Sequence, residues 1–133
     1  MTAIAAGLFE QTSDGPRLLG AACGSCGVVT FPRQRSCPRC TSLDMHDRLL
    51  AREGTLWSWT IQCFAPKSPP YAGDAERFAP YGVGYVELPG EVRVEALLTE
   101  SAPERLSIGM PMRLTLVPAP GNVDKLTFAF EPA

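Results

Sequence analysis

The chain has 133 residues, 45% of them hydrophobic, and a formal net charge of −2. This length allows one modest domain or a small metal-stapled module beside a barrel-sized one, and we favour the second arrangement. No apolar run reaches about 18 residues and the first residues carry no basic stretch, so we expect neither a membrane-spanning helix nor a secretory signal. We therefore expect a soluble, cytoplasmic protein.

Charge is unevenly distributed along the chain. Residues 17–52 hold six arginines against two aspartates, whereas residues 53–133 hold ten acidic residues against six basic ones. A dedicated nucleic-acid-binding protein normally has a broad positive surface, which this composition does not provide. The basic segment either meets a compact anion, such as a nucleotide-like phosphate group, or is a solvated face.

Residues 1–16 have apolar positions at helical spacing, namely Ile4, Ala5, Leu8 and Phe9. Asp14-Gly15-Pro16 would end such a helix. This pattern predicts a short N-terminal helix that packs against another surface.

Residues 17–52 contain two C-x-x-C knuckles separated by ten residues. Two tight turns of this kind supply four thiolates for one tetrahedral ion, so we predict a structural Zn²⁺ bound by Cys23, Cys26, Cys37 and Cys40. The alternatives are a pair of disulfides or four unrelated thiols that fall near one another. Short strand-like runs flank the knuckles, as in a zinc ribbon. Because four thiolates leave no open coordination position, the metal would stabilise the fold and not activate water.

Residues 53–133 show five period-2 segments with a short helical stretch, 103–108, between the third and fourth segments. This order predicts a five-stranded Greek-key barrel of the OB type, although the strand count alone also fits an SH3-like barrel. The predicted fold class is therefore mainly β: an N-terminal helix, a rubredoxin-like zinc ribbon and an OB-fold barrel.

The first barrel segment runs from Gly54 to Phe64. Its alternation places Thr55, Trp57, Trp59, Ile61 and Cys63 on one face. Both tryptophans are therefore predicted to lie in the core, and Cys63 is predicted to be a buried, inert thiol.

Residues 65–80 form the longest predicted loop and contain four prolines. Loops of this length in compact domains commonly bind a ligand, and prolines reduce the entropy lost on ordering. The aromatic residues and two cations in it suit a ligand with an apolar part and an anionic part. A plain surface loop is the alternative.

Catalytic residues are not recognisable in the chain. His46 is the only histidine, and a solvated side chain is the favoured interpretation over a hydrolytic base acting with a nearby aspartate. Gly82-Val83-Gly84 lies within a strand pattern and lacks the helix that a phosphate-binding loop requires. The residues alone thus indicate a binding or scaffolding subunit.

The order of several motifs resembles a known family, the zinc-ribbon and OB-fold proteins first catalogued as domain of unknown function family thirty-five. The motifs are Leu18-Leu19, Cys23-x-x-Cys26-Gly27, Phe31-Pro32-Arg33, Cys37-Pro38-x-Cys40, Gly54-x-x-x-Ser58-x-Thr60, Pro80-Tyr81-x-Val83, the Gly-Glu-Val-Arg hairpin and Ile108-Gly109-Met110. The resemblance covers nearly the whole chain.

This resemblance implies an accessory subunit of a thiolase-superfamily enzyme, either a thiolase or a lipid-transfer-protein-like aldolase that shortens steroid side chains, in a hetero-oligomer. The catalytic residues would lie on the partner. The N-terminal helix and ribbon would dock on the enzyme, and the barrel with its proline-rich loop would help to bind acyl-CoA. By this analogy the ligand contacts centre on Lys67, Tyr71, Phe78 and Tyr81.

A different function class competes with this one. Zinc ribbons and OB barrels also bind single-stranded nucleic acid, for which Trp57, Trp59 and Phe64 could act as stacking platforms. The acidic total charge and the predicted burial of both tryptophans disfavour this alternative.

Overall fold

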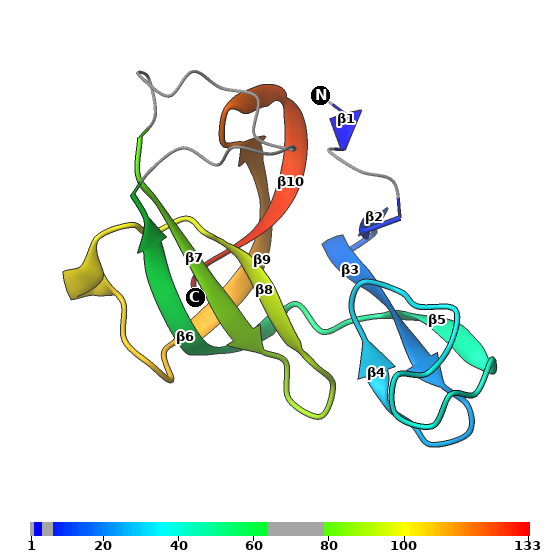
Figure 1. Ribbon diagram of the computed structural model, residues 1–133. Helices are drawn as coiled ribbons and strands as arrows, with labels where there is room; N and C mark the ends of the chain where they lie inside the picture. Colours follow the sequence, from blue (N-terminus) through cyan, green and yellow to red (C-terminus); the bar gives the residue numbers. More distant parts are fainter. Residues whose placement is uncertain (1, 4–6, 64–78) are drawn as a thin grey trace.

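The computed structural model describes residues 2–3, 7–63 and 79–133. Figure 1 shows two modules side by side, a ribbon of short strands and a β-barrel. Within the described residues, no helix is long and apolar enough to cross a membrane.

The barrel consists of β6 (Glu53–Gln62), β7 (Tyr81–Glu87), β8 (Arg93–Leu98), β9 (Pro111–Ala119) and β10 (Asn122–Pro132). The strands run in the order β9-β6-β7-β8-β10, and β10 pairs with β9 to close the barrel. All these pairings are antiparallel except that of β8 with β10. One 3-10 turn, Pro103–Arg105, stands where a short helix was predicted. The five-strand OB prediction is confirmed.

The ribbon is built on β3 (Gly15–Cys23), which pairs antiparallel with β4 (Val29–Thr30) and β5 (Met45–Leu49). Cys23 is the last residue of β3, so the first knuckle follows the strand directly. β4 leaves that knuckle and β5 follows the second one. The strands therefore hold the two knuckles next to each other.

The predicted N-terminal helix is wrong. β1 (Thr2–Ala3) pairs parallel with β10, and β2 (Phe9–Thr12) forms a hairpin with β3. The Thr12 hydroxyl donates to the carbonyl of Gly15 at 2.8 Å and accepts from the amide of Asp14 at 3.2 Å, and Gly15 has φ 109°. Ser13 and Asp14 thus form a two-residue hairpin turn, followed by Gly15 at positive φ, and not a helix stop. Ile4 and Ala5, which suggested the helical spacing, lie outside the described residues.

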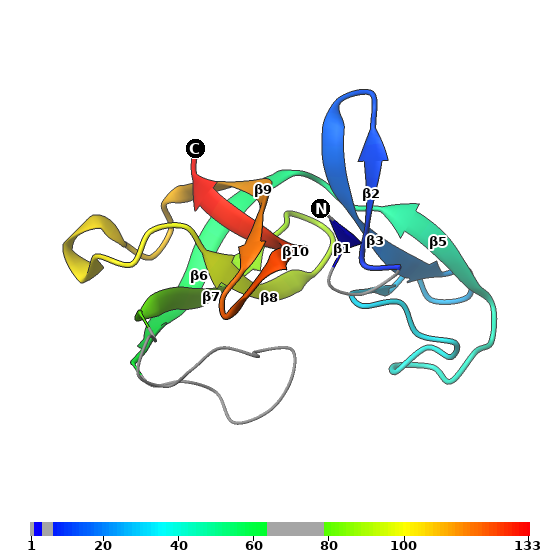
Figure 2. The same cartoon turned by 90° about the horizontal axis from the view of Figure 1, so that it is seen from above.

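One hydrophobic core runs through both modules. Ribbon residues Leu18 and Val29, together with Leu50 after β5, belong to the same buried cluster as the barrel residues Leu56, Val86, Leu88, Val94, Ala96, Leu98, Leu106, Met112, Leu114 and Phe130. Figure 2 shows β1 lying between the barrel and the ribbon strands. The two modules are therefore packed together and not merely linked in sequence.

Two further contacts join the modules. The rings of Phe31 and Phe128 meet edge to face with centroids 5.3 Å apart. Glu91, in the hairpin between β7 and β8, accepts from the Arg48 side chain at 2.8 Å and from the amide of Ala51 at 2.8 Å. Its side chain is only 7% exposed, and both of its carboxylate oxygens accept hydrogen bonds at the junction.

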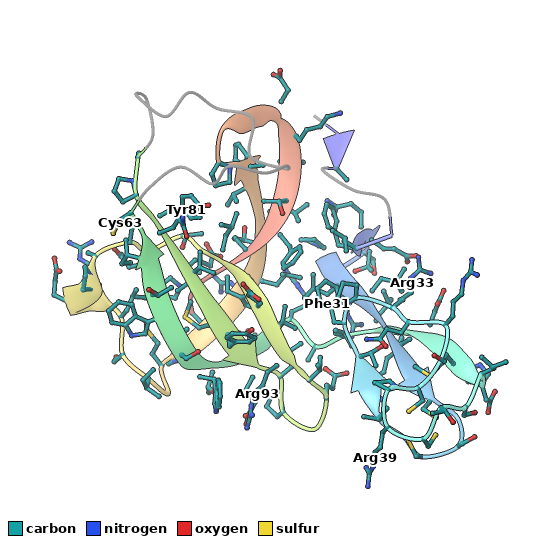
Figure 3. All side chains as sticks on the ribbon, in the orientation of Figure 1. Phe31, Arg33, Arg39, Cys63, Tyr81 and Arg93 are labelled. Atoms are coloured by element: carbon teal, nitrogen blue, oxygen red, sulfur yellow. The ribbon has the colours of Figure 1, made fainter. Side chains whose placement is uncertain are left out.

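A β-bulge changes the faces of β6. The register with β7 shifts between Leu56 and Ser58, which leaves Trp57 as the extra residue. Leu56 is 1% exposed, Trp57 is 47% exposed, and Trp59 packs against the core. The prediction that both tryptophans lie in the core is wrong for Trp57. The predicted burial of Cys63 is also wrong, because this thiol is exposed at the end of the strand (Figure 3).

Candidate metal centre and inter-module groove

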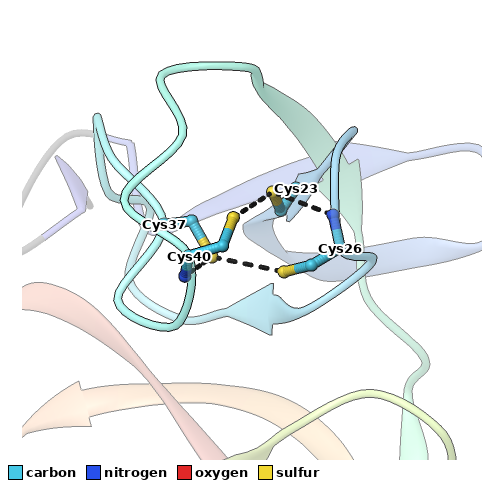
Figure 4. A group of neighbouring side chains, drawn as sticks. All are labelled: Cys23, Cys26, Cys37 and Cys40. Carbon is cyan, nitrogen blue, oxygen red and sulfur yellow. Dashed lines mark hydrogen bonds between the residues drawn. The ribbon is translucent and has the colours of Figure 1, made fainter.

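The two knuckles bring four thiols together (Figure 4). The Sγ atoms of Cys23, Cys26, Cys37 and Cys40 all lie within 4.8 Å of one another. Cys23 and Cys40 are 3.6 Å apart and Cys26 and Cys37 are 3.5 Å apart. Tetrahedral zinc with Zn–S bonds of about 2.3 Å requires S···S separations of about 3.8 Å. The cluster therefore has the size and donor type of a zinc site.

The two knuckles share one backbone geometry. Cys23 Sγ accepts from the amides of Ser25 and Cys26 at 3.4 Å each, and Cys37 Sγ accepts in the same way from Arg39 and Cys40. Each knuckle then closes with an amide bonded at 2.9 Å to the carbonyl of its first cysteine. These N–H donors stabilise thiolates and orient them for a metal.

The closing residues of the two knuckles differ in kind. Both have a positive φ, 81° at Gly27 and 64° at Thr41. Glycine adopts this conformation at little cost, whereas threonine rarely does. Gly27 was therefore a sequence signal for the first turn, while Thr41 gave no such signal for the second.

The pKa values of the thiols differ across the cluster. The amide of Cys26 is the largest effect on Cys23, and with the neighbouring donors it lowers the pKa of that thiol to about 6. Burial acts to raise the pKa of Cys37, but the amides of Cys40 and Arg39 outweigh it and lower the pKa. The amide of Ser42 acts to lower the pKa of Cys40, whereas burial and the other three thiols raise it to about 12. Four clustered thiolates thus need a positive ion to exist together.

His46 lies near the centre without forming a catalytic site. Its Nε2 is 2.7 Å from Asp44 Oδ1, and its side chain is 67% exposed. The hydroxyl of Ser42 contacts the hydroxyl of Ser25 and accepts from the amide of Asp44. Among the described residues, His46 therefore has an orienting carboxylate but no nucleophile.

Most arginines of the basic segment bind within the protein. Arg17 donates to the carbonyls of Leu49 and Leu50, and Arg52 donates to the carbonyl of Asp14. Arg33 pairs with Asp47 at 3.1 Å, and Arg48 pairs with Glu91. Arg39 points away from the ribbon (Figure 3). These arginines mainly join strands, which favours a structural role over a shared anion site.

The predicted ligand residues are only partly visible. Lys67, Tyr71 and Phe78 lie outside the described residues, as do Phe64 and most of the proline-rich loop. Tyr81 opens β7 opposite Gln62 and is half-buried. Figure 3 places Tyr81 and Cys63 at the same end of the barrel, where the loop leaves β6 and returns to β7.

The structure contains a groove that the sequence did not reveal. This inter-module groove has a volume of about 660 Å³ and lies between the ribbon side, represented by Leu8 and Phe31, and the barrel residues Tyr85, Arg93, Glu95 and Phe128. Figure 3 shows Phe31 between the two modules. The walls of the groove come from segments about 100 residues apart in the chain, so no local motif could have indicated the groove.

An aromatic cluster stands on the outer face of the barrel beside the groove. The Arg93 guanidinium lies 4.2 Å from the ring centroid of Trp57, and the rings of Trp57 and Tyr85 meet edge to face at 6.1 Å. Arg93 also pairs with Glu87 at 2.9 Å. The Tyr85 hydroxyl donates to Glu95 at 3.2 Å, and this bond raises the pKa of Tyr85.

Comparison with protein families matches both modules. Residues 16–46 match the model of the ChsH2 rubredoxin-like zinc-ribbon domain, and residues 47–117 match that of the ChsH2 C-terminal OB-fold domain. The two matches follow the order in which the structure places the ribbon and the barrel.

Similar proteins include enzyme subunits and scaffold proteins. The benzoylsuccinyl-CoA thiolase subunit BbsA of Thauera aromatica is 33% identical over 88% of this chain and 76% of its own length. A DUF35 domain-containing scaffold protein of Methanocaldococcus jannaschii is 31% identical over 70% of this chain and 62% of its own length. The chain thus spans less than two thirds of the second relative.

A solved structure is similar in both sequence and fold. The structure described as an Ltp2-ChsH2(DUF35) aldolase contains a chain that is 29% identical to this one. The superposition has a TM-score of 0.64 and covers 87% of this chain and 84% of that chain. A DUF35-family protein from Sulfolobus solfataricus, 12% identical with a TM-score of 0.54, shares the fold.

Proposed function

The chain belongs to the ChsH2 family of zinc-ribbon and OB-fold proteins, and from this premise we propose that it is a non-catalytic subunit of a thiolase-superfamily enzyme. The partner would be a thiolase or a steroid side-chain retro-aldolase. The observation that carries the proposal is the paired match of ribbon and barrel, shared with a thiolase subunit over most of both chains and with a chain of an aldolase structure.

The metal would serve the fold. Cys23, Cys26, Cys37 and Cys40 would hold one Zn²⁺, and a closed shell of four thiolates would supply cross-linking and no reactive water. We place the ribbon at residues 17–52 and the barrel at residues 53–133. A cluster of reduced thiols is maintained in a reducing compartment such as the cytoplasm, which is where we place the complex.

The acyl-CoA substrate would be shared with the partner. We retain Lys67, Tyr71, Phe78 and Tyr81 as the proposed contacts, since a cation and aromatic rings suit a ligand that carries phosphates and an apolar acyl group. The ribbon remains a candidate docking surface for the enzyme. The internal pairing of most arginines in the basic segment argues against binding of nucleic acid.

Affinity capture tests the proposal. The tagged 133-residue chain would be isolated from a lysate of its host, and the co-purified protein would be identified and quantified together with zinc. We expect a thiolase-superfamily protein at equal stoichiometry and one zinc per chain. Recovery of the chain with nucleic acid that dissociates in high salt, or as a zinc-loaded monomer alone, would contradict the proposal.

A further inference from the structure

Strand β8 has a partly unpaired edge. Along its whole length, Arg93–Leu98, it pairs with β7 on one side. On the other side β10 reaches only Leu97 and Leu98. Among the residues that the structure describes, no strand pairs with Arg93–Ala96 on this side. β1 occupies the neighbouring stretch of β10, at Lys125 and Leu126, so none of the described strands pairs with this edge of β8, which we call the gap.

Within the described residues, two residues of β8 have unpaired backbone groups. In the hairpin, the amide of Leu88 donates to the carbonyl of Val92 at 3.0 Å, so the even-numbered residues of β8 direct their amides and carbonyls toward β7. The amide of Thr99 donates to Phe130 at 3.0 Å, which shows independently that the odd-numbered residues direct theirs toward β10. The N–H and C=O groups of Arg93 and Glu95 therefore face the gap. An edge of this kind is a template for another extended chain.

The inter-module groove lies along this edge. Its volume of about 660 Å³ falls within the range of ligand clefts, and Leu8, Phe31 and Phe128 form its apolar wall. A bound strand would satisfy the two free backbone positions on one side and would bury alternate apolar side chains against the aromatic wall on the other.

The charges along the groove favour a basic occupant. Arg93 is already paired with Glu87 at 2.9 Å. Glu95 accepts a hydrogen bond from the neutral Tyr85 hydroxyl, and within the described residues it forms no ion pair. Its negative charge is thus available to a lysine or arginine of an incoming segment.

We propose that the inter-module groove is a docking site for an extended segment of the partner protein, which adds a strand to the free edge of β8 and places a basic side chain beside Glu95. The identity of the occupant as a segment of the enzyme partner rests on the proposed function. The chemistry of the segment, alternating apolar and basic residues in an extended backbone, rests on the groove alone.

A peptide probe tests the chemistry without the partner. The zinc-loaded, ¹⁵N-labelled full chain would be titrated by NMR with the blocked peptide acetyl-Val-Lys-Val-Thr-Val-Lys-Val-amide. In the free chain, we expect the amide hydrogens of Arg93 and Glu95 to exchange quickly with solvent and those of Val94 and Ala96 to exchange slowly. On peptide binding, the amides of Arg93 and Glu95 should shift and become protected.

Matched controls separate strand addition from non-specific peptide binding. Two N-methylated peptides would be compared, one methylated at the odd-numbered amides and one at the even-numbered amides. Only one edge of the peptide meets β8, so one of the two peptides should lose binding and the other should keep it. Glu95→Gln should weaken binding about threefold, whereas Glu104→Gln, on the exposed 3-10 turn, should leave it unchanged.

Several outcomes would overturn the inference. These are the absence of shifts at millimolar peptide, equal binding by both N-methylated peptides, or protection of Arg93 and Glu95 in the peptide-free chain through self-association. In the purified complex with a thiolase-superfamily protein, exchange of these two amides must slow. If the complex forms and they stay exchangeable, the docking inference fails and the proposed function stands. If the peptide binds and no enzyme is captured, the proposed function fails, while the binding of an extended basic segment in the groove stands.

Discussion

At the scale of single residues, the metal centre depends on thiols that differ in depth. Cys37 is 1% exposed and accepts two amide hydrogen bonds, whereas Cys26 and Cys40 are exposed. Because Cys37 is buried, water cannot reach the zinc to take the place of its thiolate. A serine hydroxyl at this position would be a poor zinc ligand.

We therefore expect Cys37→Ser to abolish zinc binding and to lower the free energy of unfolding by about 3 kcal/mol or more. Zinc per chain, measured by mass spectrometry, and denaturant unfolding would show this. Cys63→Ser is the matched control, because this thiol is exposed and lies outside the cluster. Zinc retained at one per chain in the Cys37 variant would refute the four-thiolate site.

Tyr85 gives a pH-dependent prediction. Its hydrogen bond to Glu95 raises the pKa of Tyr85 above its ordinary value of 10.0, so the neutral phenol is favoured in the folded chain. The bond contributes stability below the unfolded pKa, and that contribution is lost as the pH rises through the folded pKa. We expect Glu95→Gln to lower the pKa of Tyr85, as measured by absorbance at alkaline pH against a Tyr85→Phe reference. An unchanged titration would remove Glu95 as the cause.

At the scale of elements, the bulge in β6 separates two tryptophans that simple alternation would place together. Trp57 is held on the surface by Tyr85 and Arg93, and Trp59 packs against the core. We expect Trp57→Ala to cost about 1 kcal/mol of unfolding free energy and Trp59→Ala about 3 kcal/mol. Chemical denaturation of both variants checks this. Equal losses would mean that the register shift at Trp57 is absent.

The accuracy of the sequence-based predictions also differs between elements. The knuckles and the alternating strand β8 were predictable, because their signals are local: cysteine spacing in one case and inward Val94, Ala96 and Leu98 in the other. The N-terminal segment was not, since four apolar residues fit helical spacing while the turn at Ser13 and Asp14 fits a hairpin. Pairing with β3 decided between them, and pairing is not visible locally.

The candidate site was also predicted only where its signals are local in the sequence. The four thiols follow from two short motifs, but Thr41 at φ 64° carries no sequence signal. The bulge at Trp57 interrupts the alternation of β6, so the exposure of Trp57 could not be predicted from alternation, and Cys63 lies beyond Gln62, where β6 ends. The inter-module groove requires Phe31 and Phe128 to meet, which depends on how the ribbon packs on the barrel.

At the scale of the whole molecule, the ribbon and the barrel share one core. Because Leu18, Val29 and Leu50 pack with barrel residues, loss of zinc should also destabilise the barrel. Both tryptophans lie in β6 and report on the barrel. We expect a zinc chelator to lower the midpoint of thermal unfolding, followed by tryptophan fluorescence, by on the order of 10 °C. An unchanged midpoint would show that the modules are energetically independent.

The central claim is that this chain assists an enzyme and does not catalyse the reaction itself. The most direct measurement compares acyl-CoA turnover by three samples: the purified chain, the captured thiolase-superfamily partner, and their equimolar mixture. The account predicts no turnover by the chain and a clear gain of the mixture over the partner alone. Turnover by the isolated chain, or a mixture no more active than the partner, would contradict it.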